Sequence, residues 1–209
     1  MRKRMLGRLL LTSLVITGLA GTMNDNTLTN KERKFSMGLM KDTRDAAIDA
    51  TRFLAPNQLE FKIAEDKWSV KDCMYHIAAS EKMLWGMLEG AMKGPANPEK
   101  KSEVKMTDDQ VVAAVEDRSQ KFKAVEPLQP QNTGYKSLDE AVADFKSSRA
   151  QHIEYIKTTT EDLRGHFVQM PFGWIDCYQL TLMIAAHSNR HTQQMNEVKI
   201  HPDFPAPEQ

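Results

Sequence analysis

Apolar residues recur at helical spacing through most of the chain after residue 30, and five segments follow this pattern. In each segment the apolar positions lie three or four residues apart, which places them on one face of a helix. Short clusters rich in Gly, Pro, Asn and Asp separate the segments and mark loops. The spacing predicts helices over residues 31–54, 69–92, 108–124, 137–158 and 175–199.

Capping signals support two of these helices. Ser69 is placed to cap the second helix, and Asp72 three residues later completes a capping box. Thr107 and Gln110 repeat the same arrangement before the third helix. A Gly-Pro pair at 94–95 marks the end of the second helix, because proline cannot continue it.

The pattern predicts an all-α protein, since no segment, including the irregular connection over 164–173, shows convincing period-two alternation. Four long helices around one core predict a four-helix bundle, with the shorter 108–124 helix packed outside it or at one end. We expect the bundle to occupy residues 31–200. A polar linker over 23–30 precedes it, and a flexible tail over 201–209, with three prolines, follows it.

The first 22 residues have the order of a secretory signal peptide. Residues 1–8 hold four basic side chains, and an uncharged run of 12 residues follows, which ends in Gly18-Leu19-Ala20. Twelve residues are too few to span a bilayer, so we expect no stable membrane anchor after processing. Export would place the protein in the periplasm or outside the cell. The alternative is a misassigned start codon, with translation from Met23 and a cytoplasmic protein.

Composition excludes several classes of protein. The 28 basic and 28 acidic residues balance, and no basic stripe occurs, which argues against binding to nucleic acid. Two cysteines, Cys73 and Cys177, are too few for a disulfide framework. The fractions of hydrophobic and charged residues are those of an ordinary soluble domain.

The candidate chemistry lies in the last predicted helix, where His187 and His191 occupy the middle of the apolar stripe. Two imidazoles one turn apart can bind a divalent transition metal, because each neutral ring offers one lone pair. Core or surface histidines with other partners are the alternative explanation of this pair. A zinc protease of the H-E-x-x-H type is excluded because Ser188 stands where the glutamate is needed.

A catalytic metal needs a third protein ligand and an open position. His76 is the best candidate, because it lies near the apolar side of the second helix. The other three histidines, His152, His166 and His201, are expected at the surface.

These residues together resemble the DinB-like (YfiT-like) metal-binding superfamily, over about residues 31–200. The stretches that carry the likeness are Lys67-Trp68-Ser69-Val70 with His76 and Glu81, and then His187-Ser188-Asn189-Arg190-His191-Thr192-Gln193-Gln194. The resemblance implies a four-helix bundle in which His76, His187 and His191 bind a divalent metal. It also implies chemistry similar to that of thiol-dependent transferases or isomerases, and a homodimer as one assembly state.

Around this set, Glu81 and Gln194 are the candidates to orient metal ligands, although a salt-bridged or surface role is the alternative for Glu81. Arg190 is expected to form an ion pair. Cys73 is interpreted as a small core residue rather than a fourth ligand, and Trp68 as a contact that packs the second helix onto the core.

The sequence thus predicts a divalent-metal-dependent enzyme of transferase or hydrolase type that acts on an unidentified small molecule; its catalytic residues are unknown. Zinc or nickel is favoured, and iron, manganese or copper would also suit three imidazoles. A non-catalytic metal-binding or stress-associated bundle is the alternative, as is a bundle without metal. Export would separate the protein from cytosolic thiols, which weakens the thiol-dependent version.

Overall fold

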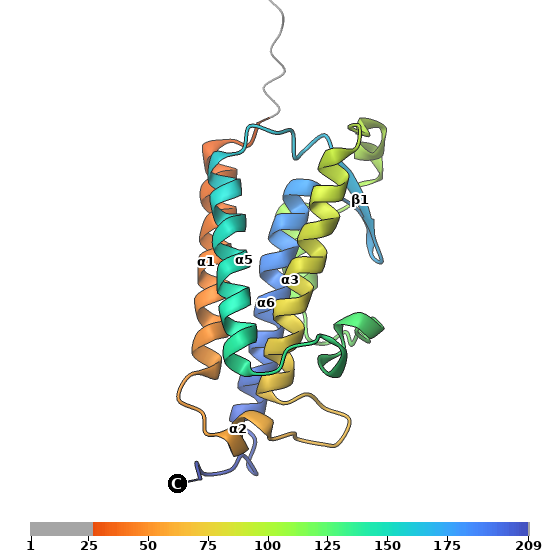
Figure 1. Cartoon of the computed structure of the whole chain (residues 1–209). Coiled ribbons are helices and arrows are strands. Elements are labelled where there is room, and N and C mark those ends of the chain that lie inside the picture. Colours follow the sequence, from red (N-terminus) through yellow and green to blue (C-terminus); the bar gives the residue numbers. More distant parts are fainter. Residues whose placement is uncertain (1–26, 209) are drawn as a thin grey trace, which may run out of the picture.

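A computed structural model describes residues 27–208, and four long helices form its core. They are α1 (Asn30–Thr51), α3 (Val70–Lys93), α5 (Leu138–Thr158) and α6 (Cys177–Lys199). Figure 1 shows that α1 and α6 run in one direction along the bundle while α3 and α5 run in the other. The predicted mainly α-helical four-helix bundle is confirmed.

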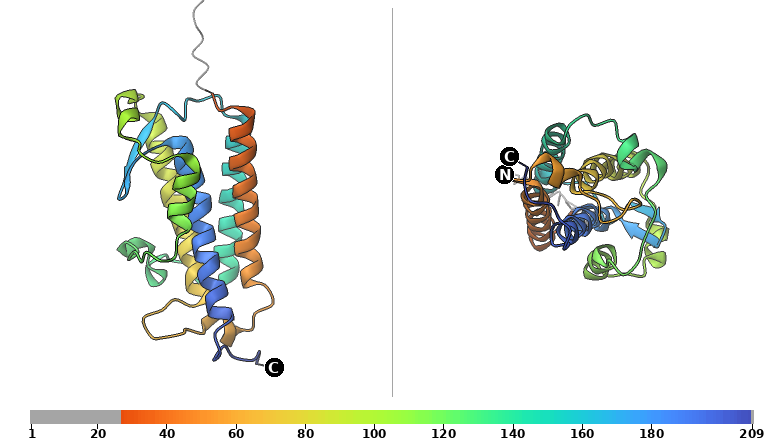
Figure 2. Two further views of the ribbon diagram at one scale, coloured as in Figure 1. Left: turned by 180° about the vertical axis from the view of Figure 1, so that it is seen from behind. Right: turned by 90° about the horizontal axis from the view of Figure 1, so that it is seen from below.

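The order of the helices around the bundle differs from their order in the chain. Helix α6 packs against both α1 and α3, and α5 packs against the same two helices on the other side. The α3–α6 interface therefore lies opposite the α1–α5 interface (Figure 2). This arrangement decides which residues can meet, because side chains on α3 and α6 share one side of the bundle.

The shorter elements gather mainly on α3 and α6. They are α2 (Pro56–Glu60), the 3₁₀ turns η1 (Pro98–Glu103), η2 (Glu126–Leu128) and η3 (Pro130–Asn132), helix α4 (Asp108–Glu116), and the strands β1 (Phe167–Met170) and β2 (Gly173–Asp176). Helix α4 packs on α6, while η2 and η3 contact α3. The hairpin contacts α3 through β1 and α6 through β2.

Both predicted capping boxes are present. Ser69 accepts a hydrogen bond from the backbone of Asp72, whose side chain accepts one from the backbone of Ser69. Thr107 and Gln110 form the same reciprocal pair at the start of α4. Each box satisfies backbone N–H groups that a helix start leaves without partners.

Two predicted helices end earlier than expected. Helix α4 stops at Glu116 rather than near 124, because Asp117 adopts extended backbone angles. Helix α1 stops at Thr51 rather than 54. Phe53, which the apolar pattern assigned to that helix, lies beyond its end with a φ of 59° and a fully exposed side chain. Sequence spacing alone did not separate this exposed phenylalanine from the buried stripe.

The connection over 164–173 was expected to be irregular, but part of it forms an antiparallel hairpin. Phe167 pairs with Asp176 and Met170 with Gly173. Gly173 has a φ of 125°, which a residue with a Cβ atom rarely adopts. Strands of four residues are too short to show a clear period, and both ends of β1 are buried. For these two reasons the apolar pattern did not predict the hairpin.

The C-terminal tail was expected to be loose, whereas its described part lies on α2. Phe204 packs edge-on against Phe61, and the carbonyls of Pro205 and Ala206 accept hydrogen bonds from Gln58 and Asn57. Helix α2, of five residues, was not predicted from the sequence; it begins at Pro56.

The predicted signal peptide and the Met23 alternative lie outside the described residues, so export stays a prediction. Among the helices of residues 27–208, none combines the length and apolar character that a membrane crossing requires.

One fully buried side chain, Arg149 of α5, hydrogen-bonds to the other three helices of the bundle. Its Nε and Nη2 donate to the two carboxylate oxygens of Glu81 on α3, both at 2.7 Å. Its Nη1 donates to the Met40 carbonyl and the Thr43 hydroxyl on α1, and Nη2 also donates to Ser188 Oγ on α6. All five N–H donors of the guanidinium are used.

Loss of this side chain should destabilise the whole bundle. Arg149→Met removes the guanidinium that is hydrogen-bonded to both oxygens of the buried Glu81 carboxylate, so the free energy of unfolding should fall by about 3–5 kcal/mol. Urea denaturation measures this change. Lys146→Met, an exposed change on the same helix, is the control and should shift stability by less than about 0.5 kcal/mol. An Arg149→Met protein as stable as the wild type would contradict a structural role for the pair.

Candidate metal centre

The three predicted histidines converge between α3 and α6. His76 lies in the second turn of α3, and His187 and His191 are one turn apart on α6. The helices run in opposite directions, so the start of α3 lies beside the later part of α6 (Figure 1). We call His76, His187 and His191 the histidine triad.

The ring nitrogens of the triad face a common point. The Nε2 atoms of His76 and His187 lie 3.3 Å apart, and one nitrogen from each ring lies within 4.8 Å of the others. Two ligands at about 2.0–2.1 Å from a tetrahedral ion are separated by about 3.3 Å. The spacing of the first pair therefore suits a four-coordinate ion.

Two rings are oriented through their Nδ1 atoms. His76 Nδ1 donates to the Leu128 carbonyl at 2.8 Å, and His191 Nδ1 donates to Gln194 Oε1 at 3.1 Å. Both partners are oxygen acceptors, so Nδ1 carries the proton and Nε2 keeps its lone pair. Metal-binding histidines are held by this type of contact. Gln194 lies where the sequence placed an orienting residue.

Aromatic packing closes one side of the triad. The ring of Trp68 lies 4.7 Å from that of His76 and stacks at 5.7 Å on that of His191. The sequence predicted that Trp68 packs the second helix onto the core. In the structure its ring contacts two of the triad histidines. Ser80 Oγ also approaches His76 Nε2, at 3.4 Å.

Burial keeps all three rings neutral. It lowers the pKa of His76, and burial together with the neighbouring His76 lowers the pKa of His187 to about 3. Burial and the two other rings hold the pKa of His191 well below its ordinary value. Metal binding requires this neutral form, because a protonated imidazole has no lone pair to donate.

His187 is the most exposed residue of the triad. His76 and His191 are buried, whereas His187 is partly exposed. Cys73 is fully buried in the apolar core, and burial raises the pKa of its thiol. It does not belong to the cluster of ligand atoms found in residues 27–208, which agrees with its interpretation as a core residue.

Glu81 does not touch the triad. Its carboxylate, 2% exposed, binds Arg149 and accepts a hydrogen bond from His152 Nδ1 at 2.7 Å. Burial alone would raise the pKa of Glu81, but the charge of Arg149 and the hydrogen bonds outweigh burial and lower it. Of the two roles considered for Glu81, the salt-bridged one is observed.

His152 was expected at the surface, and this expectation was wrong. Only 5% of it is exposed, and its ring stacks on Trp85 at 3.7 Å. The polar residues near His152 in the sequence suggested an exposed position. One of them, Arg149, is itself buried. His166 and His201 are partly exposed.

Arg190 was expected to form an ion pair, but it binds backbone carbonyls instead. Its guanidinium donates to the carbonyls of Val115, Asp117 and Gln120 around the end of α4. The last carbonyls of a helix have no partner within the helix, so an arginine is a favourable donor to them. The sequence could not show this contact, because it joins segments 70 residues or more apart.

A comparison with known protein families identifies the family of this chain. The sequence profile of the DinB superfamily matches residues 39–195, which is more than half of the chain and includes the whole triad. The chain belongs to the DinB superfamily. No curated protein matches it.

A solved structure shares the DinB superfamily fold. It is YfiT from Bacillus subtilis, described as a probable metal-dependent hydrolase with an unusual four-helix bundle topology. The match covers 83% of this chain and 89% of YfiT, with a TM-score of 0.57 and 10% sequence identity. At this identity the likeness shows the fold alone.

The ionised Glu81 gives stability a specific pH dependence. Its pKa is lower in the folded than in the unfolded chain, so its contribution is present above its ordinary value of 4.5 and is lost as the pH falls. The difference in unfolding free energy between wild type and Glu81→Gln should therefore be largest near pH 7 and shrink between about pH 5 and 3. Urea denaturation at a series of pH values tests this.

The control for this pH series is Glu154→Gln, which alters an exposed ion pair with Lys157. It should give a small difference from the wild type at every pH. A Glu81→Gln difference that stays constant down to pH 3 would mean that the carboxylate is not ionised in the folded protein.

Proposed function

We propose that the protein is a divalent-metal-dependent hydrolase that uses the histidine triad to hold one ion and acts on a small molecule. The observation that carries the proposal is the convergence of three neutral imidazoles, with 3.3 Å between the Nε2 atoms of His76 and His187. The description of YfiT as a probable metal-dependent hydrolase supports the choice of reaction class.

The donor set fits a catalytic rather than a structural ion. Structural zinc sites have four protein ligands, whereas catalytic sites have three and an open position. The cluster within residues 27–208 offers three ligand atoms, and His187 is partly exposed beside them. These features favour an enzyme over the alternative of a non-catalytic metal-binding bundle.

A bound divalent ion supplies Lewis acidity, which polarises a substrate oxygen and makes water a better nucleophile at neutral pH. Residues of the chain orient the imidazole rings. Leu128 and Gln194 hold two rings by their Nδ1 atoms, and Trp68 covers the faces of the same rings. We propose zinc, because the observed nitrogen spacing is that of a tetrahedral site.

Removal of one triad ligand should remove the metal. His76→Ala and His187→Ala proteins, purified without a histidine tag, should contain less than about a tenth of the zinc found in wild type, because two ligands bind the ion weakly. Elemental analysis measures the content. His201→Ala, which changes a histidine outside the triad, is the control and should retain full metal. Full metal in the two triad variants would rule out the site.

A ligand test separates the enzyme from a structural metal site. In cobalt-substituted protein, an open coordination position should change the visible spectrum when small anions or thiols are added. A spectrum unaffected by every small ligand would favour the non-catalytic alternative.

Gln194 should tune metal affinity without binding the ion. Gln194→Leu removes the acceptor for His191 Nδ1 and should weaken zinc binding about 10- to 100-fold in competition with a chromophoric chelator. Gln194→Glu keeps an acceptor oxygen and should retain most of the affinity. The neighbouring change Gln193→Leu is the control, since Gln193 bonds to the Glu116 carbonyl. Equal losses in Gln194→Leu and Gln193→Leu would contradict the assigned role.

A further inference from the structure

A hollow lies on the other side of the bundle from the triad, between α1 and α5. It is a groove of about 580 Å³, lined by Arg44, Asp45, Ile48, Asp49 and Arg52 from α1 and its end, and by Lys146 and Ala150 from α5. We call it the α1–α5 groove. Its volume lies in the range of small-molecule sites, about 300–1,000 Å³.

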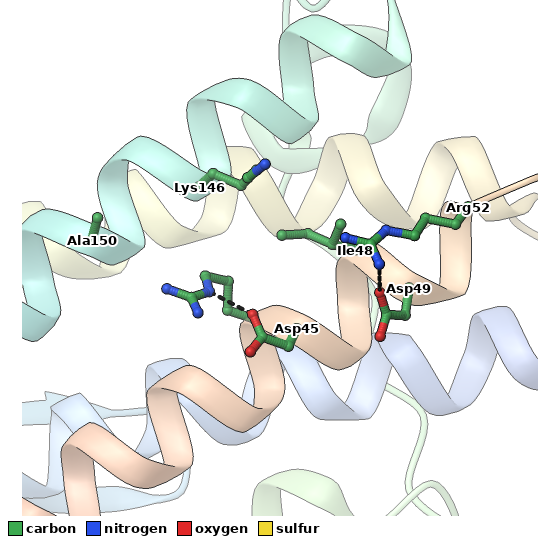
Figure 3. A pocket seen from close by; sticks show the side chains of 7 residues that line it. Asp45, Ile48, Asp49, Arg52, Lys146 and Ala150 are labelled. Carbon is green, nitrogen blue, oxygen red and sulfur yellow. Dashed lines mark hydrogen bonds and ion pairs between the residues drawn. The ribbon is translucent and has the colours of Figure 1, made fainter.

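Three cationic side chains approach this groove from both helices. Figure 3 shows Lys146 reaching from α5 towards α1, while Arg52 extends back from the end of α1 over Ile48. Arg44 lies two turns before Arg52 on the same stripe of α1, with Ile48 between them. A ligand in the groove would therefore meet positive charge from three directions.

Much of the hydrogen-bonding capacity of these cations is unused. Among residues 27–208, the partner of Arg44 is Asp45, bound through Nε, and Arg52 pairs through Nη1 with Asp49. Lys146 has no ion-pair partner among the residues that the structure describes. The ammonium of Lys146 and both Nη groups of Arg44 thus remain available to a ligand.

The two aspartates do not cancel this charge. Each pairs with an arginine near it in the sequence, and each is 60% exposed, so water screens its outer side. The lining carries three basic and two acidic groups, a net charge of +1. The groove therefore favours an anion.

The floor of the groove leaves room for such a ligand. Ile48 is 7% exposed and forms an apolar base, and Ala150 carries only a methyl group where a longer side chain would fill the space. A tetrahedral oxyanion offers several terminal oxygens to donors from different directions, whereas a carboxylate offers two in one plane. We propose that the α1–α5 groove binds a small phosphate-bearing anion, independently of the metal centre.

Pyrophosphate is the probe for this site, and isothermal titration calorimetry on the full chain measures its binding. We expect one bound pyrophosphate per chain, and about tenfold weaker binding in Arg44→Gln and in Lys146→Ala, since each removes a charge-assisted hydrogen bond. Ala150→Glu should abolish binding by filling the groove and repelling the anion. Circular dichroism checks that each variant is folded.

Two control variants show whether binding is specific to the groove. Lys157→Ala removes one positive charge from α5 outside the groove and should leave affinity unchanged within about twofold. His187→Ala disables the triad and should also leave binding unchanged. The proposal is overturned if pyrophosphate does not bind, if Lys157→Ala weakens binding as much as Lys146→Ala, or if binding is lost in His187→Ala, which would place the anion at the metal.

Discussion

The buried guanidinium of Arg149 is the interaction on which the arrangement of the four helices depends. It lies on α5, bonds to α1, α3 and α6, and its partner Glu81 also holds His152. Hydrogen bonds have a narrow range of length and direction, whereas apolar side chains pack in several registers of similar energy. The network therefore sets the axial register of helices that the apolar core alone would leave less well defined.

This register also positions the metal centre. Ser188, which accepts from Arg149, follows His187 directly, and Glu81 is five residues beyond His76 on α3. The same contacts that align α3 and α6 thus bring the ring nitrogens within 4.8 Å of one another. They also pair the buried Glu81 carboxylate with Arg149, which offsets its negative charge near the triad. An ion held by three neutral rings would keep its full positive charge, which suits Lewis-acid chemistry.

Periodicity was sufficient to predict the long helices and the inward-facing pair His187 and His191, because each depends on spacing within one helix. His76 joined this pair through its place near an apolar face and through the resemblance to the superfamily. Periodicity failed where a residue's surroundings come from distant segments. His152 was expected at the surface, since a buried polar or charged side chain is recognised only through partners such as Glu81 on another helix. The Leu128 carbonyl that orients His76 belongs to a loop 52 residues away, and a backbone acceptor leaves no mark in the sequence.

The long connection between α3 and α5 covers the side of the bundle on which α3 and α6 meet. Residues 94–137 leave the end of α3, place α4 on α6, and return past η2 and η3 against α3. With the β1–β2 hairpin they surround the side of the bundle that contains the triad (Figure 2). The bundle helices supply the three histidines, whereas much of the chain packed on this side of the bundle comes from these added segments. In the proposed enzyme, selectivity can change with the connection while the triad and the Arg149 network stay in place.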